Sequence, residues 1–240
     1  MTQPRAMTLI KMNPPSERED EWNEWYSTVH SPGRFECGLE TFRRFELMPN
    51  EPPVDTQQPG MAKYLAIMEW PDTSCLTSDA YNAVTERWTA LPSDSWEHVT
   101  MTLPNFARGV FEQIGSYPTG SEALLPETKY VFLSAHEVPV AIQDEFNDYY
   151  VMEHMPLVLD VPGINSVRRF FHRSDEFPAM LSNGGELFTH LALWEIESEK
   201  VFHDPKFASY TPTAWQQRLR KLFTIKMSNV YKEISRGSAA

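Results

Sequence analysis

The sequence predicts an α+β protein built from two copies of one unit, and two observations lead to this prediction. A motif with helical spacing, Trp/Phe-x-x-x-Tyr-x-x-x-His-x-Pro, begins at Trp22 and again at Phe146, a shift of 124 residues (146 − 22). Both halves also contain short β-rich runs and amphipathic helical runs in the order β-α-β-β-α-β. Similarity that keeps its order at a regular spacing indicates an internal repeat.

Further matches extend the repeat along the chain, and their shift grows from 124 to 127 (215 − 88). Single-residue differences in loop length between two copies would produce this drift. We therefore predict two repeats, residues 1–118 and 119–240. The matched pairs are Gly38 and Gly163, Arg43 and Arg168, Arg44 and Arg169, Phe45 and Phe170, Leu65 and Leu191, Glu69 and Glu195, and Trp88 and Trp215.

In the first half, strands are predicted where β-rich runs are bounded by proline and glycine, and helices where apolar residues recur at helical spacing. Glycine and proline residues interrupt the segment between the two repeats, as in a linker. The predicted elements are strands at residues 6–12, 38–47, 62–70 and 106–115, helices at 16–28 and near 80–90, a loop at 50–60 and a linker at 112–127.

The second half follows the same order. Pro139 ends its first strand, and Pro162 with Gly163 ends its first helix. The predicted elements are strands at residues 129–135, 163–172, 187–196 and 225–234, helices at 141–159 and 212–223, and a turn at 182–185.

Each β-α-β-β-α-β unit is ferredoxin-like, and its two helices cross the same face of the sheet, so the other face is bare. A bare apolar face of this size needs a cover. With two such units in one chain, we expect the sheets to pack on each other as a pseudo-symmetric α+β barrel with the helices outside.

The repeated helix motif, followed by glycine and a strand with Arg-Arg-Phe, resembles the dimeric α+β barrel superfamily, and within it the EthD-like branch, here as a tandem duplication. The resemblance covers both halves. It implies relatives that include cofactor-free oxygenases of aromatic polyketides, polyketide cyclases, lactone isomerases and haem-degrading enzymes.

Composition excludes several other classes of protein. The net charge of −12 opposes binding to nucleic acid or to anionic lipid. No segment approaches the ~20 apolar residues of a membrane helix, and the first residues lack the apolar run of a signal peptide, so we expect a cytoplasmic protein. Cys37 and Cys75 both lie in the first half and are expected to be reduced.

The helix motif supplies the first candidate site residues. Phe146, Tyr150 and His154 are spaced i, i+4, i+8 and share one helical face. We assign His154 as general acid or base, with the Tyr150 hydroxyl as its partner. Alternatively, this face packs on the sheet as core, and the histidine caps the helix end. The residues expected to bind substrate are Phe146, Tyr149, Trp194, His30 and Tyr26.

The second half is expected to hold the working site because it has more histidines than the first. His136 stands where the first half has Met12, and His190 stands where it has Tyr64. On strands of period two, each lies on one face, and the three imidazoles converge with His154 if those faces look toward the helix. Alternatively, these histidines are scattered over the surface.

Arg168 completes the set of catalytic candidates. On a strand, one arginine of the Arg168-Arg169 pair points to each face of the sheet. An inward guanidinium needs an anion, which a substrate carboxylate or enolate would provide. Alternatively, Glu69 or Glu195 on a neighbouring strand is its partner, since the glutamate repeats together with the arginine.

No cofactor is predicted, because the sequence lacks the GxGxxG, GxxxxGK[ST], HExxH, CxxC and GxSxG patterns. No metal is expected either; if one binds, the first ligand candidates are His136, His154 and His190. Haem would need an axial histidine in a broad apolar pocket.

Several functions from different classes are compatible with these residues. One is a cofactor-independent lyase, isomerase or cyclase that moves protons on a small aromatic or polyketide-like molecule. The alternatives are a ligand-binding or stress-related barrel without catalysis, and a monooxygenase of the cofactor-free or haem type. We also expect that the chain can form a homodimer.

Overall fold

The structure is a computed structural model that describes residues 5–48, 62–103, 106–118, 126–173, 177 and 188–239. The predicted loop at 50–60 and turn at 182–185 lie outside these residues. The strands in the described part are β1 (Ala6–Met12), β2 (Thr41–Leu47), β3 (Tyr64–Trp70), β4 (Ala107–Tyr117), β5 (Tyr130–Glu137), β6 (Ile164–His172), β7 (His190–Ile196) and β8 (Thr224–Ser238).

Short helices connect these strands, and each half has its own set. The first half has α1 (Glu19–Trp25), α2 (Ser31–Gly33), α3 (Asp79–Thr89) and α4 (Trp96–Met101); the second has α5 (Gln143–Tyr149), α6 (Met155–Leu159), α7 (Pro205–Ala208) and α8 (Ala214–Leu219). Across the described residues, no helix is long and apolar enough to cross a membrane.

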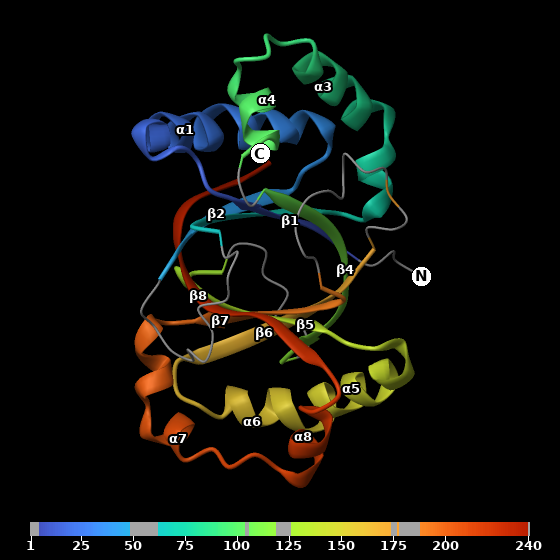
Figure 1. The fold of residues 1–240 in the computed structure, drawn as a ribbon, viewed down its shortest axis with the longest axis vertical. Helices are drawn as coiled ribbons and strands as arrows, with labels where there is room; N and C mark the ends of the chain where they lie inside the picture. Colours follow the sequence, from blue (N-terminus) through green and yellow to red (C-terminus); the bar gives the residue numbers. More distant parts are fainter. Residues whose placement is uncertain are drawn as a thin grey trace.

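The strands close into one antiparallel barrel in the order β1-β3-β2-β8-β5-β7-β6-β4. Each half contributes four neighbouring strands in the same internal order, and the halves are joined by backbone pairing of β2 with β8 and of β4 with β6. The helices of the two halves lie outside the barrel on opposite sides (Figure 1). The prediction of an α+β barrel with external helices is confirmed.

Pairing between the halves explains why two strands are longer than predicted. β8 continues to Ser238 because its last residues pair with β2, where Ser238 faces Thr41. β4 continues to Tyr117, which faces Val167 of β6. The predicted start of the linker at residue 112 is therefore wrong, since residues 112–117 belong to the barrel.

The first helix of each half contains a π-helical turn, which the spacing argument missed. These turns are η2 (Tyr26–His30) and η6 (Tyr150–His154), and each lies between two α-helical segments. In the first half the helical run then continues through the 3₁₀ turn η3 (Arg34–Cys37) to Gly38, whose φ of 92° is favourable for glycine. π-Helical turns inside α-helices occur frequently at functional sites.

The structure corrects one pair in the predicted repeat. Trp215 Nε1 donates a hydrogen bond of 3.0 Å to Glu145. In the first half the equivalent donor to Glu21 is Trp96 Nε1, at 2.9 Å. Trp96 on α4, and not Trp88 on α3, is therefore the counterpart of Trp215.

Apolar side chains form three layers. Inside the barrel, Leu9, Ile67, Phe111, Leu133 and Leu193 are among the buried residues contributed by both halves. Two further layers lie between the outer face of the sheet and the helices, one in each half. Alternate residues of each strand therefore face either the shared interior or the helices of their own half.

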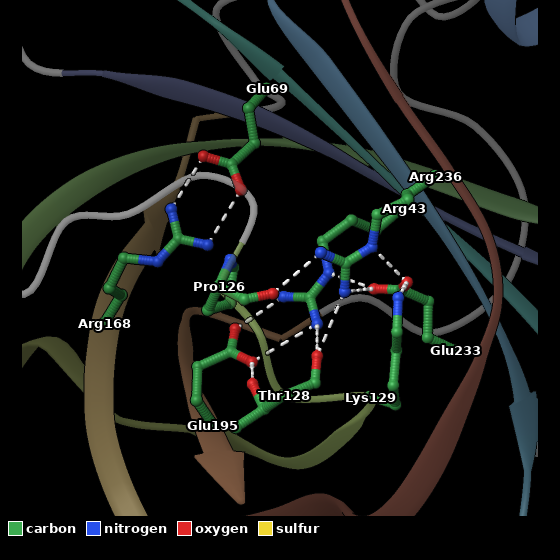
Figure 2. Close-up of polar contacts among 9 residues, drawn as sticks. All are labelled: Arg43, Glu69, Pro126, Thr128, Lys129, Arg168, Glu195, Glu233 and Arg236. Carbon is green, nitrogen blue, oxygen red and sulfur yellow. Dashed lines mark hydrogen bonds and ion pairs between the residues drawn. The ribbon is translucent and has the colours of Figure 1, made fainter.

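Ion pairs between the halves lie in the barrel interior (Figure 2). Arg168 donates two hydrogen bonds to Glu69 of the first half, at 2.6 and 2.7 Å. Arg43 donates at 2.6 Å to Glu195 and at 2.7 Å to Glu233, both in the second half. Each repeat thus supplies the carboxylate for the other repeat's arginine.

This arrangement assigns Arg168 a partner. Its neighbour Phe170 faces the interior and Val167 faces the helices, so Arg168 lies on the opposite side of the sheet from the helix with His154. The structure therefore contradicts a contact between Arg168 and a ligand bound at His154, and supports the ion-pair alternative, with Glu69 as the acid.

Replacing Glu69 by Leu should destabilise the fold by about 3–5 kcal/mol, because Arg168 is then left buried without its carboxylate. The double variant Glu69→Leu with Arg168→Met should recover most of this loss. Urea unfolding measures both. The control is Arg87→Ala, which breaks an exposed pair with Glu36 and should cost less than about 1 kcal/mol. A single Glu69 variant no less stable than this control contradicts the assigned role.

Candidate functional site

A pocket of about 100 Å³ lies in the first half, between the outer face of the sheet and the helices. Thr8 and Ile10 of β1, Met68 and Trp70 of β3 and Arg108 of β4 form its floor; the helical side is formed by Tyr26, His30, Arg34, Tyr81, Thr85, Trp88, Glu97, His98, Thr100 and Met101. Phe106 completes the wall. The pocket therefore combines aromatic side chains with several polar groups.

His30, at the end of the π-helical turn, lies in this wall among three aromatic rings. Its ring centroid is 4.6 Å from that of Tyr26, 4.7 Å from that of Trp88 and 5.0 Å from that of Trp25. Its Nδ1 is buried and has no hydrogen-bond partner within the described part of the chain. Burial, and then the charges of Arg34 and Arg108, hold the His30 pKa well below 6.5, so the imidazole is neutral at pH 7.

Arg34 is the charged group nearest to His30 in sequence, one helical turn further on. It is only 7% exposed. Its guanidinium lies 4.0 Å above the ring of Trp88 and 4.9 Å from that of Tyr81. Nη1 is buried without a hydrogen-bond partner among the residues described.

Arg108 adds a second guanidinium from the floor of the pocket. Its Nε is likewise buried and unpartnered in the described structure. Burial lowers the pKa of Arg108, and the charge of Arg34 lowers it further. No salt bridge joins either arginine to a described carboxylate, and Glu97 of the pocket accepts a hydrogen bond of 3.2 Å from Trp25 Nε1. Two arginines and one glutamate therefore leave the pocket with an excess of positive charge.

Two more polar atoms of the pocket, Thr85 Oγ1 and His98 Nε2, are also buried without a partner inside the described ranges. Unpartnered buried polar groups are uncommon in proteins, and several in one cavity indicate a place for a polar ligand. Sequence reasoning missed Arg34, Arg108, Thr85 and His98. The i, i+4 spacing of His30 and Arg34 was the signal that could have found the first of them.

In the second half, the predicted candidate His154 has a hydroxyl partner other than the one expected. Its Nδ1 lies 3.3 Å from the hydroxyl of Tyr149, whereas the Tyr150 hydroxyl lies 3.5 Å from His136 Nε2. The π-helical turn causes this difference, because it brings residues i and i+5 together. Trp25 and His30 make the corresponding contact in the first half.

The strand histidines do face the helix with His154. Phe146 lies between His136 and His190, with ring centroids 5.5 and 5.2 Å away. His190 is 2% exposed, and its Nδ1 lies 3.0 Å from Thr189 Oγ1 while Nε2 is unpartnered in the described residues. The scattered-surface alternative is therefore excluded for His136 and His190.

Burial lowers the pKa of all three imidazoles. The pKa is about 4 for His154 and about 3 for His190, in each case because of burial and then the charge of Arg169. Burial and the neighbouring His154 and His190 hold the pKa of His136 well below 6.5. These groups are neutral at pH 7. A catalytic role for them stays a prediction.

The two halves differ at matched positions. Tyr149, which binds His154, is matched by Trp25 (149 − 124), whose Nε1 turns to Glu97 and leaves His30 Nδ1 free of described partners. Arg34 is matched by Val158 (34 + 124). Arg108 pairs with Ile10 across the sheet. Ile10 is matched by Ser134 (10 + 124) in the second half, and Ser134 pairs with Ser228, so Ser228 is the counterpart of Arg108. Arg34 and Arg108 thus have no arginine at the matched positions of the second half.

Metal binding finds no support in the described residues: no three His, Cys, Asp or Glu side chains gather closely enough to hold an ion. His136, His154 and His190, the ligand candidates from sequence, do not form such a group.

Comparison with known proteins finds related folds. No family model and no curated protein matches the chain. Among solved structures, an anthrone oxidase-like protein is 13% identical with a TM-score of 0.67, covering 99% of this chain and 94% of its own. A provisionally assigned monooxygenase from Fusobacterium nucleatum is 7% identical with a TM-score of 0.53, covering 100% and 97%.

A chlorite dismutase from Candidatus Nitrospira defluvii is 11% identical with a TM-score of 0.52, and the match covers 98% of this chain and 92% of that one. Likeness at these identities concerns the fold. The chain has the ferredoxin-like α+β barrel fold of these proteins.

Haem, which the sequence resemblance implies for some relatives, does not fit the first-half pocket. Three aromatic rings lie within 5.0 Å of the His30 ring, centroid to centroid. The volume of about 100 Å³ is also below the ~300 Å³ of the smaller pockets that enclose drug-sized ligands. In the second half, the Tyr149 hydroxyl lies 3.3 Å from Nδ1 of His154, and the rings of Tyr150 and Trp194 pack against the imidazole. This histidine therefore does not fit haem either.

The buried imidazole of His190 should make the protein less stable in acid. Its folded pKa of about 3 lies below the ordinary 6.5, so its stabilising effect is complete above pH 6.5 and is lost as the pH falls from there toward 3. Between pH 7.5 and 5, this group should cost about 2 kcal/mol of unfolding free energy. His190→Gln should lose correspondingly less over that range in urea titrations.

The exposed Val140 supplies the control, since Val140→Gln removes no titratable group and should keep the wild-type pH dependence. If His190→Gln and the wild type lose the same free energy between the two pH values, the imidazole is not buried in its neutral form.

Proposed function

We propose that this chain is an enzyme that oxidises an enolisable or phenolic aromatic compound with O₂, and that its working site is the pocket of the first half. The observation that carries the proposal is the unpartnered Nδ1 of His30 in a cavity with two arginines that have no described acid partner. The similarity of the fold to an anthrone oxidase-like protein and to a provisionally assigned monooxygenase supports the reaction class.

Proton abstraction by His30 is the first step in this proposal. Its Nδ1 accepts a proton from an acidic C–H or O–H group of the substrate, which becomes an enolate or phenolate. Burial, and then the charges of Arg34 and Arg108, lower the pKa of His30 and weaken the imidazole as a base. A bound anion offsets their charge, so the arginines stabilise the product of deprotonation while His30 regains basicity.

Oxygen transfer to this carbanion needs no external reductant. If the substrate offers a CH₂ group, the balanced reaction is CH₂ + O₂ → C=O + H₂O. The substrate supplies all four electrons, one oxygen atom enters the carbonyl group, and the other leaves as water. The pocket residues therefore have to bind the substrate, remove its proton and stabilise its anion.

Pocket size limits how a substrate is held. The volume of about 100 Å³ is smaller than the ~150 Å³ of an apolar cavity that binds benzene. Part of one ring, with its reacting carbon near His30, therefore occupies the pocket, and the rest of the substrate extends outside it.

The second candidate is proton transfer alone, by lyase, isomerase or cyclase chemistry on an aromatic or polyketide-like molecule. Its support is the group of three imidazoles around Phe146 in the second half, where His154 would act with Tyr149. Oxygen consumption separates the two candidates. A barrel that only binds its ligand would transform no substrate in either assay.

We also propose that the two halves arose by tandem duplication within the EthD-like branch of the barrel proteins. The support is the repeated helix motif, the π-helical turn in each copy and the equivalent hydrogen bonds of Trp96 and Trp215.

His30→Ala should lower the rate of 1,8-dihydroxyanthrone oxidation by about 100-fold or more, because the base that forms the anion is lost. The readouts are O₂ uptake and absorbance of the quinone, each corrected for the reaction in buffer. His154→Ala, the matched change in the other half, should alter the rate less than about 3-fold once folding is verified by circular dichroism. The reverse ranking would assign the activity to the second half.

Activity should also survive exhaustive dialysis against EDTA and phenanthroline, because the residues proposed for catalysis need no Lewis acid to move the proton. Elemental analysis of the active protein accompanies the assay. A loss of activity that stoichiometric iron or zinc restores would contradict this expectation.

A further inference from the structure

The pocket of the first half contains positive charge that the described protein does not neutralise. Arg34 and Arg108 line the same cavity, and neither forms a salt bridge with a described carboxylate. Other buried arginines have described partners. Arg43 and Arg168 have glutamate partners at 2.6 Å. Arg44 and Arg169 have no salt bridge in the described part of the chain, but each donates a hydrogen bond of 2.6 Å to an asparagine side-chain oxygen. Burying a guanidinium without an anion is costly, so two such groups in one pocket call for a ligand that supplies the anion.

The donors of these arginines are available for that ligand. Arg34 Nη1 and Arg108 Nε are both buried, and neither has a hydrogen-bond partner among the described residues. Arg34 is 93% buried (100 − 7), and its guanidinium carbon lies 4.0 Å from the centroid of the Trp88 ring. A planar anion that receives N–H groups from two guanidinium ions matches this arrangement.

Comparison of the halves shows that the fold does not require Arg34 and Arg108. The second half builds the same layer of helices on its sheet with Val158 and Ser228 at the equivalent positions. Arginine at positions 34 and 108 is therefore not needed to complete the barrel or its helix layer. Arg34 and Arg108 are thus two cations that the second half lacks at the equivalent positions.

We propose that this pocket selects aromatic ligands with a permanent carboxylate, and that Arg34 and Arg108 bind that carboxylate. This inference names the substrate class of the proposed site and rests on that site. Tyr81, Trp88 and Phe106 supply aromatic rings in the lining of the pocket, against which the ring of the ligand packs. The second half, without the arginines, does not share this preference.

Binding of 2-naphthoate and 2-naphthamide to the full chain tests the proposal, because the two probes share their shape and differ in charge. Calorimetry should give at least about 10-fold tighter binding of the naphthoate by the wild type, as expected for a hydrogen bond to a charged group. Arg34→Val and Arg108→Ser, which copy the second half, should each weaken naphthoate binding about 10-fold or more and change naphthamide binding less than about 3-fold.

Arg87→Ala is the matched control, since Arg87 is exposed on α3 and paired with Glu36; it should change neither affinity. Thermal melts verify that the variants fold, and Arg34→Gln replaces Arg34→Val if the latter does not. Equal affinity of the wild type for the two probes, no detectable naphthoate binding, or equal effects of the arginine variants on both probes would each overturn the proposal.

The outcome is distinguishable from that of the proposed oxidation, because these measurements involve no turnover. Selective naphthoate binding without oxidation of either 1,8-dihydroxyanthrone or an anthrone that carries a carboxylate would leave the carboxylate site standing and remove the oxidase. Anthrone oxidation without a preference for the charged probe would do the opposite.

Discussion

The crossed ion pairs in the barrel interior are the interaction on which the rest of the structure depends. Glu69 of the first half neutralises Arg168 of the second, and Glu195 of the second neutralises Arg43 of the first. A buried guanidinium that loses its carboxylate costs several kcal/mol, so neither half can complete its sheet alone. The pairs therefore favour one relative placement of the halves, and this leaves the two helix layers on opposite sides of the barrel (Figure 1).

Separate helix layers allow the same motif to acquire different chemistry. In the second half the imidazole of His154 is bonded to a tyrosine hydroxyl and packed among aromatic rings. In the first half, Trp25 replaces that tyrosine, and His30 faces a cavity beside Arg34. We propose that one layer became a reactive pocket, whereas in the other layer the imidazoles are packed among aromatic rings.

Local patterns in the sequence predicted much of this fold. β1 has the predicted bounds of Ala6–Met12, and nearly all of its residues are buried, because one of its faces meets the barrel interior and the other meets the helices. The π-helical turns were missed, since a spacing of i, i+4, i+8 does not reveal an inserted residue. The partner of Arg168 could not be chosen, because pairing between the halves depends on barrel closure. Arg34 and Arg108 are 74 positions apart (108 − 34) and meet only in three dimensions.

The central claim is that ligand binds in the first half, and nitrogen-15 NMR of the histidine side chains tests it most directly. The chain has seven histidines, of which His30 and His98 line the pocket, and His136, His154 and His190 lie in the other layer. Titration with 2-naphthoate should shift the ring resonances of His30 and His98 and leave the second group unchanged. Shifts of His154 and His190 with no response from His30 would contradict the account.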